Sequence, residues 1–463
     1  MRETNGQLLR DAVDYVDRWL AYQQKLKEIP ALTVAVRHGD DVILSKAYGH
    51  ANLERCAPVT PESIFRVASH SKWFTATAVM QLKEQGKLRL DDPLPQYVTW
   101  LSGPLASATI RQVLNHAAGI TRDGYDNDHW QLEHPFPDKE QLRALVEDGG
   151  EILPSNHKLK YSNIGYSLLG EVVEIAGGMP YNHYVKKNIV DRLGLKSTGP
   201  DTTPEVRSRM ATGYTSRGLL MPRIPLPDVE TGAMSSATGF YSTALDLSRF
   251  AGAHFFGNDE LISDESKREM QRPYWPVDGM DSYGLGMQVI KIGDRWMSGH
   301  SGSFPGHSTR TCLDPEGRLA VSILTNESSG VTTELTKSVV KLIDLALKQK
   351  PSERGADRGH YTGRFTSLWG YTDIVRLGEQ LFTIEPAVDD PATMAFKLEV
   401  LDENTLKIEE KEGYGSPGET VRYVRHEDGS IITITLAGST QYPLGTAQDY
   451  LQRRREELTA PKM

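Results

Sequence analysis

The sequence predicts an α/β (α+β) protein: an antiparallel sheet flanked by helices, a helical subdomain, and then a small all-β barrel. Three observations support this prediction. Strand-like runs occur near both ends of the first 350 residues, the stretch from about 73 to 200 is mostly helical, and short alternating strands fill the chain after residue 355. A sheet assembled from both ends of one domain accounts for the first two observations, and a separate β-domain accounts for the third.

An opening helix and a hairpin are predicted at the start of the chain. Apolar residues recur at helical spacing over 8–20, ahead of Pro30, and predict an amphipathic helix. The segment 32–49, LTVAVRHGDDVILSKAYG, contains two β-rich runs about a polar turn and predicts an antiparallel hairpin. The helical stretch 73–200, which polar loops interrupt, is then expected to be a subdomain inserted into the sheet.

Strand patterning returns in the second half of the larger domain. The segments 283–302 and 308–326 both read as β-rich, and the second turns at 314–317, Asp-Pro-Glu-Gly. A helical run over 335–347 follows. We therefore expect early and late strands to share one antiparallel sheet, with helices on both of its faces.

A separate C-terminal domain is predicted. The charged stretch 348–360, KQKPSERGADRGH, is rich in glycine and proline and marks a boundary near residue 352. Short runs such as TDIVRL, LFTIEP and TVRYVRH follow at regular spacing with turn signals between them, as in a small β-barrel or sandwich. The predicted domains are 1–350 and 355–463.

Composition and charge exclude several classes of function. The 463 residues carry a net charge of −9 with both signs interspersed, so nucleic acid is not an expected partner. The charged N-terminal segment and the lack of an apolar run of about 18 residues predict no membrane insertion and a cytoplasmic location. Cys56 and Cys312 are far apart and are expected to be buried thiols. His129, His134 and His157 lack metal-ligand spacing, so no metal is expected.

The segment 65–80, FRVASHSKWFTATAVM, places polar residues at the front of an apolar helix. Ser69 and Lys72 lie on one helical face, whereas Ser71 points elsewhere. A lysine of lowered pKa can remove the serine proton, and a serine in the first turn has its own N–H free to hold an oxyanion. His70 is expected at the rim of the pocket or in solvent. Taken alone, this pattern is more typical of a capping serine and a solvated lysine.

Two further stretches favour the catalytic interpretation. Tyr-Ser-Asn at 161–163 precedes a helical run, and His-Ser-Gly at 300–302 ends a β-run. Each has a structural explanation of its own: a tyrosine packed at a helix entrance, an asparagine that caps the helix, an exposed histidine at a strand end. The glycine is more informative, since a side chain beside the reacting strand would block the close approach of substrate.

In their chain order, these three motifs resemble those of the serine β-lactamase and penicillin-binding-protein superfamily. The resemblance is to its class C-like branch, with D,D-carboxypeptidases, D-aminopeptidases and esterases. The segments SIFRVASHSKWFTATAVMQLKEQGKLRLDDPL, TIRQVLNHAAGI and ATGFYSTALDLSRF are similar to segments of that family, and the resemblance extends over residues 5–347. The C-terminal β-domain is similar to the lipocalin-like domains appended to some D-aminopeptidase relatives.

The resemblance implies acyl transfer through a covalent ester on Ser69. Lys72 would accept or position the proton of Ser69, and Tyr161 would relay a proton to the leaving group; which of the two is the base stays open. No counterpart of the deacylating glutamate of class A β-lactamases is identifiable, so the same two residues would serve both half-reactions. His116 is tempting as a base, but in this family its segment looks structural. The mechanism needs no metal and no organic cofactor.

The resemblance also implies a set of substrate-binding residues. Asn163 would hydrogen-bond the amide of the substrate. His300 stands where many relatives have a lysine, and would tune the tyrosine hydroxyl electrostatically or through a hydrogen bond. The oxyanion would lie between the backbone N–H groups of the nucleophile and Ser303, and Ser301 and Gly302 complete this edge of the site.

The expected function is amide hydrolysis by a D-amino-acid-specific peptidase or amidase, of the D-aminopeptidase or D,D-carboxypeptidase kind. The substrate would be a small molecule or short peptide. A carboxylesterase or β-lactamase of the same fold is the alternative, and a penicillin-binding sensor or scaffold without turnover is an alternative of another class. Homo-oligomerisation stays open. Every enzymatic version requires Ser69, Lys72 and Tyr161 to converge at one cleft.

Overall fold

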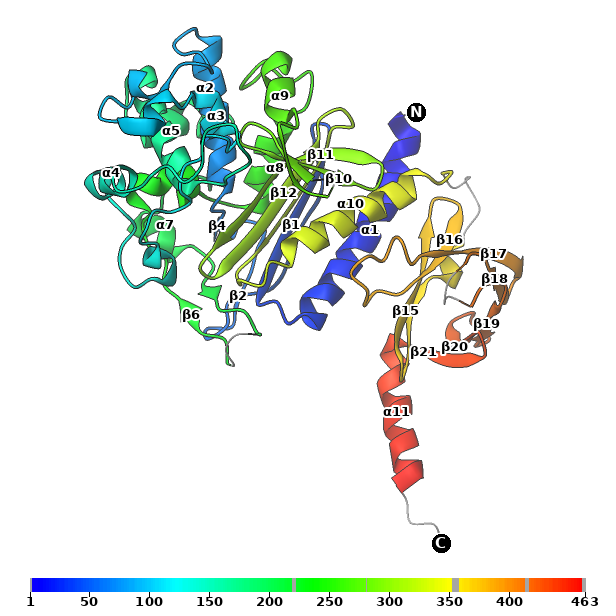
Figure 1. Ribbon diagram of the computed structural model, residues 1–463. Coiled ribbons are helices and arrows are strands. Elements are labelled where there is room, and N and C mark those ends of the chain that lie inside the picture. Colours follow the sequence, from blue (N-terminus) through cyan, green and yellow to red (C-terminus); the bar gives the residue numbers. More distant parts are fainter. Residues whose placement is uncertain (1, 219–221, 280, 352–357, 413–415, 460–463) are drawn as a thin grey trace. The chain divides into compact units, whose positions relative to one another are not determined.

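The computed structural model groups the chain into two compact units (Figure 1). One unit is Ile29–Thr336, and the other combines Met1–Glu28 with Lys337–Met463. The predicted boundary near residue 352 lies outside the described residues, so the domain limits 1–350 and 355–463 stay predictions. The structure describes residues 2–218, 222–279, 281–351, 358–412 and 416–459.

The larger unit is built on an antiparallel sheet that has nine strands in the described residues. β1 pairs with β13, with Val34 opposite Ile323, so strands from the two ends of the unit are neighbours. The β13 side chains are all buried, as expected for a strand covered on both faces. This confirms the predicted sheet assembled from both ends. Its strand order is β3 (Ala57–Pro58), β2 (Asp41–Asn52), β1 (Ala31–His38), β13 (Leu319–Thr325), β12 (His307–Asp314), β11 (Arg295–Phe304), β10 (Gln288–Ile292), β9 (Asp281–Tyr283), β8 (Trp275–Asp278).

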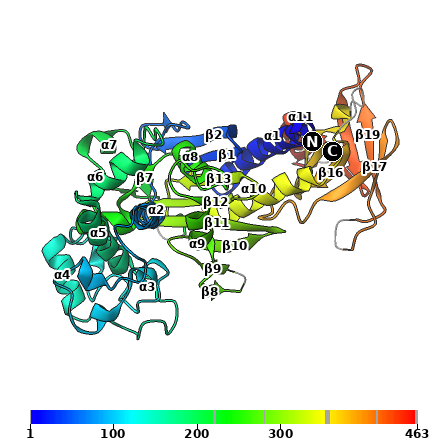
Figure 2. The same cartoon turned by 90° about the horizontal axis from the view of Figure 1, so that it is seen from above.

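Helices flank this sheet and surround one central helix. Helix α8 (Ala244–Gly252) lies against β1, β12 and β13 (Figure 2). Helix α2 (His70–Glu84) is buried on all sides as far as Leu82, and its Phe74 ring stacks 4.3 Å from Phe240 and 3.8 Å from Phe250. A helix that is buried on every side belongs in a core.

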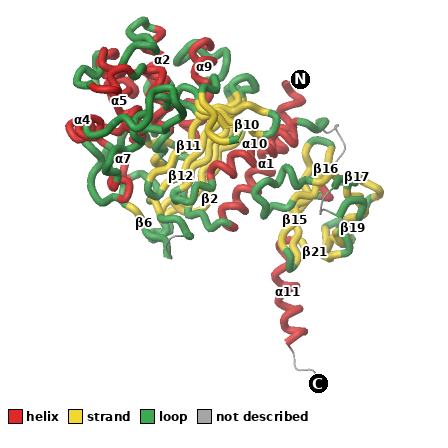
Figure 3. The backbone as a smooth tube through the Cα atoms, in the orientation of Figure 1, coloured by secondary structure: helices red, strands yellow, loops and turns green. Residues whose placement is uncertain are grey.

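Helix α2 packs against α5 (Asn163–Gly177) and the short π-helix η6 (Ser235–Gly239). Helices α2, α5 and α4 (Lys139–Glu147) lie on one side of the sheet (Figure 3). The remaining helices of the unit are α3 (Ile110–Leu114), α6 (Tyr181–Val185), α7 (Pro204–Ser208) and α9 (Asp264–Gln271), with short helices η1 (Leu94–Gln96), η2 (Gly103–Ser107), η3 (Asp128–Gln131), η4 (Lys186–Val190) and η5 (Gly232–Met234).

The other unit contains a closed antiparallel barrel, which settles the predicted choice between barrel and sandwich. Helix α1 (Arg2–Leu26) belongs to this unit: its Tyr15 hydroxyl donates to Asp373 Oδ2 at 3.1 Å, and Trp19 Nε1 donates to the Pro386 carbonyl at 3.1 Å. The barrel strands, in order, are β14 (Gly363–Ser367), β15 (Gly370–Leu377), β16 (Gln380–Ile384), β17 (Phe396–Asp402), β18 (Thr405–Ile408), β19 (Thr420–Arg425), β20 (Ile431–Leu436) and β21 (Ser439–Pro443). Helices α10 (Thr332–Leu347), η7 (Gly359–Tyr361) and α11 (Leu444–Thr459) complete the described helices, and two short two-stranded sheets pair β4 (Phe65–Arg66) with β7 (Tyr241–Ser242) and β5 (Gly213–Tyr214) with β6 (Pro225–Leu226).

The two cysteines differ in their surroundings. Cys312 is buried in β12, as predicted, whereas Cys56 is exposed, so the prediction of a buried thiol is wrong there. Cys56 lies in the turn after β2, where its N–H donates to the Leu53 carbonyl at 3.1 Å. Among the described residues, no group of three or more His, Cys, Asp or Glu side chains is arranged to hold a metal ion. None of the described helices is long and apolar enough to cross a membrane.

Candidate active site

Ser69 lies at the N-terminus of α2, where the chain turns after β4 (Phe65–Arg66). Ala68, directly before it, has a φ of 45°, a left-handed conformation that costs a non-glycine residue about 1–2 kcal/mol. Ser69 is half-buried, whereas the next three side chains are fully buried. None of the described residues accepts a hydrogen bond from the Ser69 N–H, which agrees with the predicted oxyanion donor.

The residues beside the nucleophile support the turn. The Ser71 hydroxyl donates to the Ala68 carbonyl at 2.5 Å and accepts from the Phe240 N–H at 3.0 Å, so it points away from Ser69 as predicted. His70 is fully buried, with Nε2 3.0 Å from Thr311 Oγ1. The expectation that His70 lies at the pocket rim or in solvent is wrong, because its ring is buried against Thr311 of β12.

Lys72 lies one helical turn beyond the nucleophile. Its amine nitrogen is 3.2 Å from Ser69 Oγ, 2.7 Å from Asn163 Oδ1 and 2.8 Å from the Ala237 carbonyl oxygen. The side chain is fully buried, and burial lowers the pKa of the amine well below its usual value of 10.5.

The geometry around the Lys72 amine accommodates its neutral form. A neutral lysine has two N–H donors and one lone pair, whereas the charged form has three donors. Asn163 Oδ1 and the Ala237 carbonyl can only accept, so they take the two N–H groups of Lys72. The remaining position faces the Ser69 hydroxyl; it carries the lone pair in the neutral amine, which burial favours, and a third N–H group in the ammonium form. Lys72 can therefore receive the proton of Ser69.

Tyr161 and Asn163 come from the start of α5. The Tyr161 hydroxyl donates to Ser69 Oγ at 2.9 Å, and burial raises the pKa of this phenol, so it is protonated at neutral pH. Ser162 caps the helix by accepting from the Gly165 N–H at 2.8 Å. Asn163 is thus free of the capping role, and its side chain bridges Lys72 and a buried carboxylate.

The predicted convergence of Ser69, Lys72 and Tyr161 is present in the structure. All three polar ends meet within hydrogen-bonding distance at the Ser69 oxygen. The hydroxyl of Ser69 lies at a pocket of about 560 Å³ that Asn163 and His300 also line. Their catalytic roles stay predictions.

His300 is held as a neutral histidine in β11. Its Nδ1 lies 2.6 Å from the Ser301 carbonyl, which can only accept, so Nδ1 carries the proton. Nε2 then accepts from the Tyr283 hydroxyl at 3.0 Å. Burial lowers the pKa of His300 well below 6.5. The centre of the His300 ring is 6.4 Å from the centre of the Tyr161 ring, and His300 hydrogen-bonds Tyr283 instead. Of the two influences predicted for His300 on Tyr161, a hydrogen bond or an electrostatic effect, the electrostatic effect therefore stays open.

Gly302 is required for a reason additional to the predicted one. A Cβ at this position would lie 2.1 Å from the Val67 carbonyl oxygen and 2.5 Å from Thr309 Oγ1. The absence of a side chain therefore lets β11 pack against the backbone just before Ser69, and the role of this glycine in the approach of substrate stays a prediction. Ser301 and Ser303, on either side of this glycine, line the same pocket as Ser69.

Two charged residues of the site, Arg122 and Asp123, were missed in the sequence. They belong to the loop TRDGYDNDHW, whose polarity predicts exposure, yet the Asp123 side chain is only 4% exposed. Asp123 Oδ1 accepts from Asn163 Nδ2 at 2.6 Å and from Trp130 Nε1 at 3.1 Å. The Arg122 guanidinium lies 5.3 Å from the centre of the Tyr161 ring.

His116 is structural as expected: its Nδ1 accepts from the Ser162 N–H at 3.2 Å.

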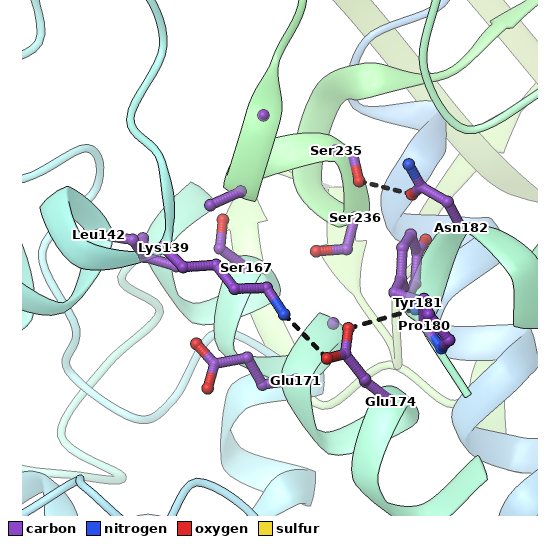
Figure 4. Close-up of a pocket in the computed structure, with 13 residues that line it drawn as sticks. Lys139, Leu142, Ser167, Glu171, Glu174, Pro180, Tyr181, Asn182, Ser235 and Ser236 are labelled. Atoms are coloured by element: carbon purple, nitrogen blue, oxygen red, sulfur yellow. Dashed lines mark hydrogen bonds and ion pairs between the residues drawn. The ribbon is translucent and has the colours of Figure 1, made fainter. Parts of the chain in front are cut away.

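A second pocket, of about 230 Å³, opens along the middle of α5 (Figure 4). Lys139 there pairs with Glu174 at 2.8 Å, and the Ser235 hydroxyl donates to Asn182 Oδ1 at 2.9 Å. None of the predicted site residues lines it.

This fold and this serine centre define the chain as a serine hydrolase of the β-lactamase and penicillin-binding-protein superfamily. The sequence model of the Beta-lactamase family matches residues 16–345, and the chain belongs to this family. It is similar to "Penicillin-binding protein 4*" of Bacillus subtilis (strain 168), with 29% identity over 346 residues that cover 70% of this chain and 75% of that protein.

Two solved structures have a similar fold. The octameric penicillin-binding protein homologue from Pyrococcus abyssi superposes with a TM-score of 0.65 at 23% identity and covers 93% of this chain and 99% of its own. The D-amino acid amidase from Ochrobactrum anthropi SV3, solved with L-phenylalanine amide, superposes with a TM-score of 0.62 at 22% identity and covers 72% of this chain and 99% of its own.

Proposed function

We propose that the protein is a serine amidase that hydrolyses amide bonds of D-amino-acid derivatives through an acyl-enzyme on Ser69, as a D-aminopeptidase or D-amino acid amidase does. The observation that carries this proposal is the placement of Ser69 Oγ between Lys72 Nζ at 3.2 Å and the Tyr161 hydroxyl at 2.9 Å. A serine, a neutral amine and a protonated phenol supply the nucleophile, the base and the acid of an acyl transfer.

Acylation begins with the proton of Ser69. It passes to the Lys72 lone pair as Oγ bonds to the substrate carbonyl carbon, and the π electrons of the carbonyl move to its oxygen. In the proposed oxyanion hole, the backbone N–H groups of Ser69 and Ser303 hold that oxygen. Lys72 leaves this step as an ammonium group.

The leaving group then needs a proton. As the carbon–nitrogen bond breaks, the leaving nitrogen takes the proton of the Tyr161 hydroxyl, and the Lys72 ammonium returns a proton to Tyr161. A water molecule deprotonated by the same pair attacks the ester, and Ser69 Oγ leaves with the proton. The sum is one amide and one water converted to an acid and an amine.

The charges of the pocket give little support to a substrate with a free carboxylate. Among its described lining residues, the charged side chains are Arg122 and Asp123, which pair at 3.2 Å. His300 is neutral and supplies no cation where a lysine would. This favours an aminopeptidase or amidase over a D,D-carboxypeptidase. Support for the D configuration comes from the likeness to the D-amino acid amidase.

A substrate panel tests this proposal. D- and L-aminoacyl amides, D-Ala-D-Ala peptides, short esters and a chromogenic cephalosporin are compared by kcat/KM, together with covalent labelling of Ser69 by a fluorophosphonate. We expect D-aminoacyl amides to have the highest kcat/KM. A preference for esters or for the cephalosporin would replace the amidase by a carboxylesterase or β-lactamase. Labelling without turnover would indicate a sensor, and no labelling a scaffold.

We also propose that the protein forms homo-oligomers. The homologue from Pyrococcus abyssi is octameric, and its chain matches almost the whole of this one. In the turn between β14 and β15, Leu368 is 84% and Trp369 95% exposed, an apolar tip of the kind that contacts partners. Light scattering on the full chain and on Trp369→Ser tests this.

The cytoplasmic location stays a prediction that cell fractionation checks.

A further inference from the structure

Arg122 and Asp123 are neighbours in sequence with opposite charge and opposite exposure. The Asp123 side chain is 4% exposed and that of Arg122 is 64% exposed. Arg122 Nε lies 3.2 Å from Asp123 Oδ2, while Asp123 Oδ1 faces inward to Asn163 and Trp130. One carboxylate therefore connects the solvent-facing guanidinium with the interior of the site.

Asp123 decides which end of the Asn163 amide faces Lys72. A carboxylate can only accept hydrogen bonds, so the Asn163 group that lies 2.6 Å from Asp123 Oδ1 is the NH₂. Asn163 Oδ1 is thereby turned to Lys72 Nζ at 2.7 Å. Without the carboxylate the amide could reverse and present N–H to N–H.

Neutral groups otherwise surround the Lys72 amine. The π-helix η6 offers it a backbone carbonyl, from Ala237. Four titratable side chains face this amine, and burial keeps each of them uncharged at neutral pH. They come from α5, from the segment just before α5, from the segment after α3 and from β11. These are Tyr166, Tyr161, His116 and His300. Among the described residues, Asp123 and Arg122 are then the ionised groups that act on the Lys72 charge.

We propose that Asp123 and Arg122 are a pair of positioning residues that set the protonation state of the Lys72 amine, Asp123 favouring the ammonium form and holding Asn163, and Arg122 opposing it. This inference rests on the proposed function, in which Lys72 is the base. It assigns to a surface loop the control of the pH range in which Ser69 reacts.

The direction of each effect follows from the charges. Asp123 raises the pKa of Lys72, and Arg122 lowers it. Since Lys72 must be deprotonated to act, removal of Asp123 moves the acid limb of the pH–rate profile to lower pH, and removal of Arg122 moves it to higher pH. A purely structural role would lower the rate at all pH values without displacing the limb.

The test measures the rate of Ser69 labelling by a fluorophosphonate from about pH 5 to pH 10, a readout that requires no knowledge of the substrate. We compare the full-length protein with Asp123→Asn, Arg122→Gln, the double variant, and Asp128→Asn, an exposed carboxylate of the same loop, as control. We expect shifts of about one pH unit downward for Asp123→Asn and upward for Arg122→Gln. The double variant should return close to the wild-type limb, and Asp128→Asn should not move it.

The outcomes separate this inference from the proposed function. The inference is overturned if Ser69 is still labelled but the acid limb of the pH–rate profile stays in place in both single variants. It is also overturned if the acid limb moves in the same direction in both. If Asp123→Asn does not fold, the exposed Arg122→Gln carries the test alone, and an unmoved limb in it decides against the pair. Wild-type protein that is not labelled at Ser69 would instead refute the proposed function.

Discussion

Two pockets border helix α5, and both contain serine and lysine side chains near a carboxylate. The lysines differ in burial and in their partners. At the first, Lys72 is fully buried, contacts neutral oxygen atoms and has a lowered pKa. At the second, the Lys139 side chain is 66% exposed and pairs with Glu174. A serine, a lysine and a carboxylate therefore do not make a nucleophile by proximity alone; the lysine must be desolvated and its N–H groups taken by neutral acceptors.

The serines of the two pockets differ in the same way. Ser69 Oγ accepts a hydrogen bond from Tyr161 and faces the Lys72 amine. In the second pocket, the Ser167 hydroxyl donates to the Asn163 carbonyl at 3.0 Å and the Ser236 hydroxyl to the Tyr166 carbonyl at 2.9 Å. A hydroxyl whose proton is held by a backbone carbonyl has no base to receive it. The following predictions test this contrast.

The largest expected effect is that of Ser69→Ala. It removes the nucleophile, and we expect fluorophosphonate labelling to disappear and hydrolysis to fall at least about a thousandfold. Ser167→Ala, at the second pocket, is the matched control and should keep both within a few-fold. Labelling that survives in Ser69→Ala but not in Ser167→Ala would reverse the assignment of the two pockets.

Lys72→Met comes next. The substitution keeps an apolar stem of similar length but removes the base, and we expect kcat/KM to fall by a factor of about 10²–10⁴. Lys139→Met breaks only a largely exposed ion pair, which contributes at most about 1 kcal/mol to stability, and should leave kcat/KM unchanged. Equal losses in the two variants would show that burial does not distinguish the lysines.

Tyr161→Phe is expected to reduce kcat/KM by about a hundredfold, because the leaving group loses its proton donor while the ring still packs against His116. The loss should be greater for amides than for activated esters, whose leaving groups need no proton. The comparison of the two substrates in one variant is the measurement. An equal loss for both would argue against the role of acid.

Among the variants around the nucleophile, the smallest effect on chemistry is expected for Ser71→Ala. Its hydroxyl bonds the Ala68 carbonyl and the Phe240 N–H, both buried, so its loss should cost about 1–3 kcal/mol of unfolding free energy. Thermal or urea denaturation measures this cost. Labelling of Ser69, measured on the folded fraction, should remain far above that of Ser69→Ala.

The sequence predicted the sheet and the three motifs because their signals are local or were carried by the resemblance. Alternating strands identify the hairpins, and the Ser-x-x-Lys spacing places Ser69 and Lys72 on one helical face. Pairing of β1 with β13 joins segments almost 300 residues apart, and it was reached through the order of elements rather than through any one residue.

Burial of single residues was less predictable. Asp123 lies in a loop of polar residues, and it is buried because it accepts hydrogen bonds from Asn163 and Trp130. The periodicity of apolar residues in the sequence does not predict these contacts. His70 and Cys56 were misplaced for the same reason, since neighbours distant in sequence decide whether a side chain is covered. Gly302 was singled out correctly, but its steric neighbour, Val67, is more than 230 residues away in the chain.

The left-handed Ala68 ties the reactive hydroxyl to the completeness of the fold. Its methyl group packs in a small buried cluster with Phe136, Met234 and Phe304, which come from three separate parts of the chain. The strained turn is held only while these segments are assembled around it. A nascent or partly unfolded chain would thus contain the same serine without its reactivity, and a covalent probe would label only the fully folded protein.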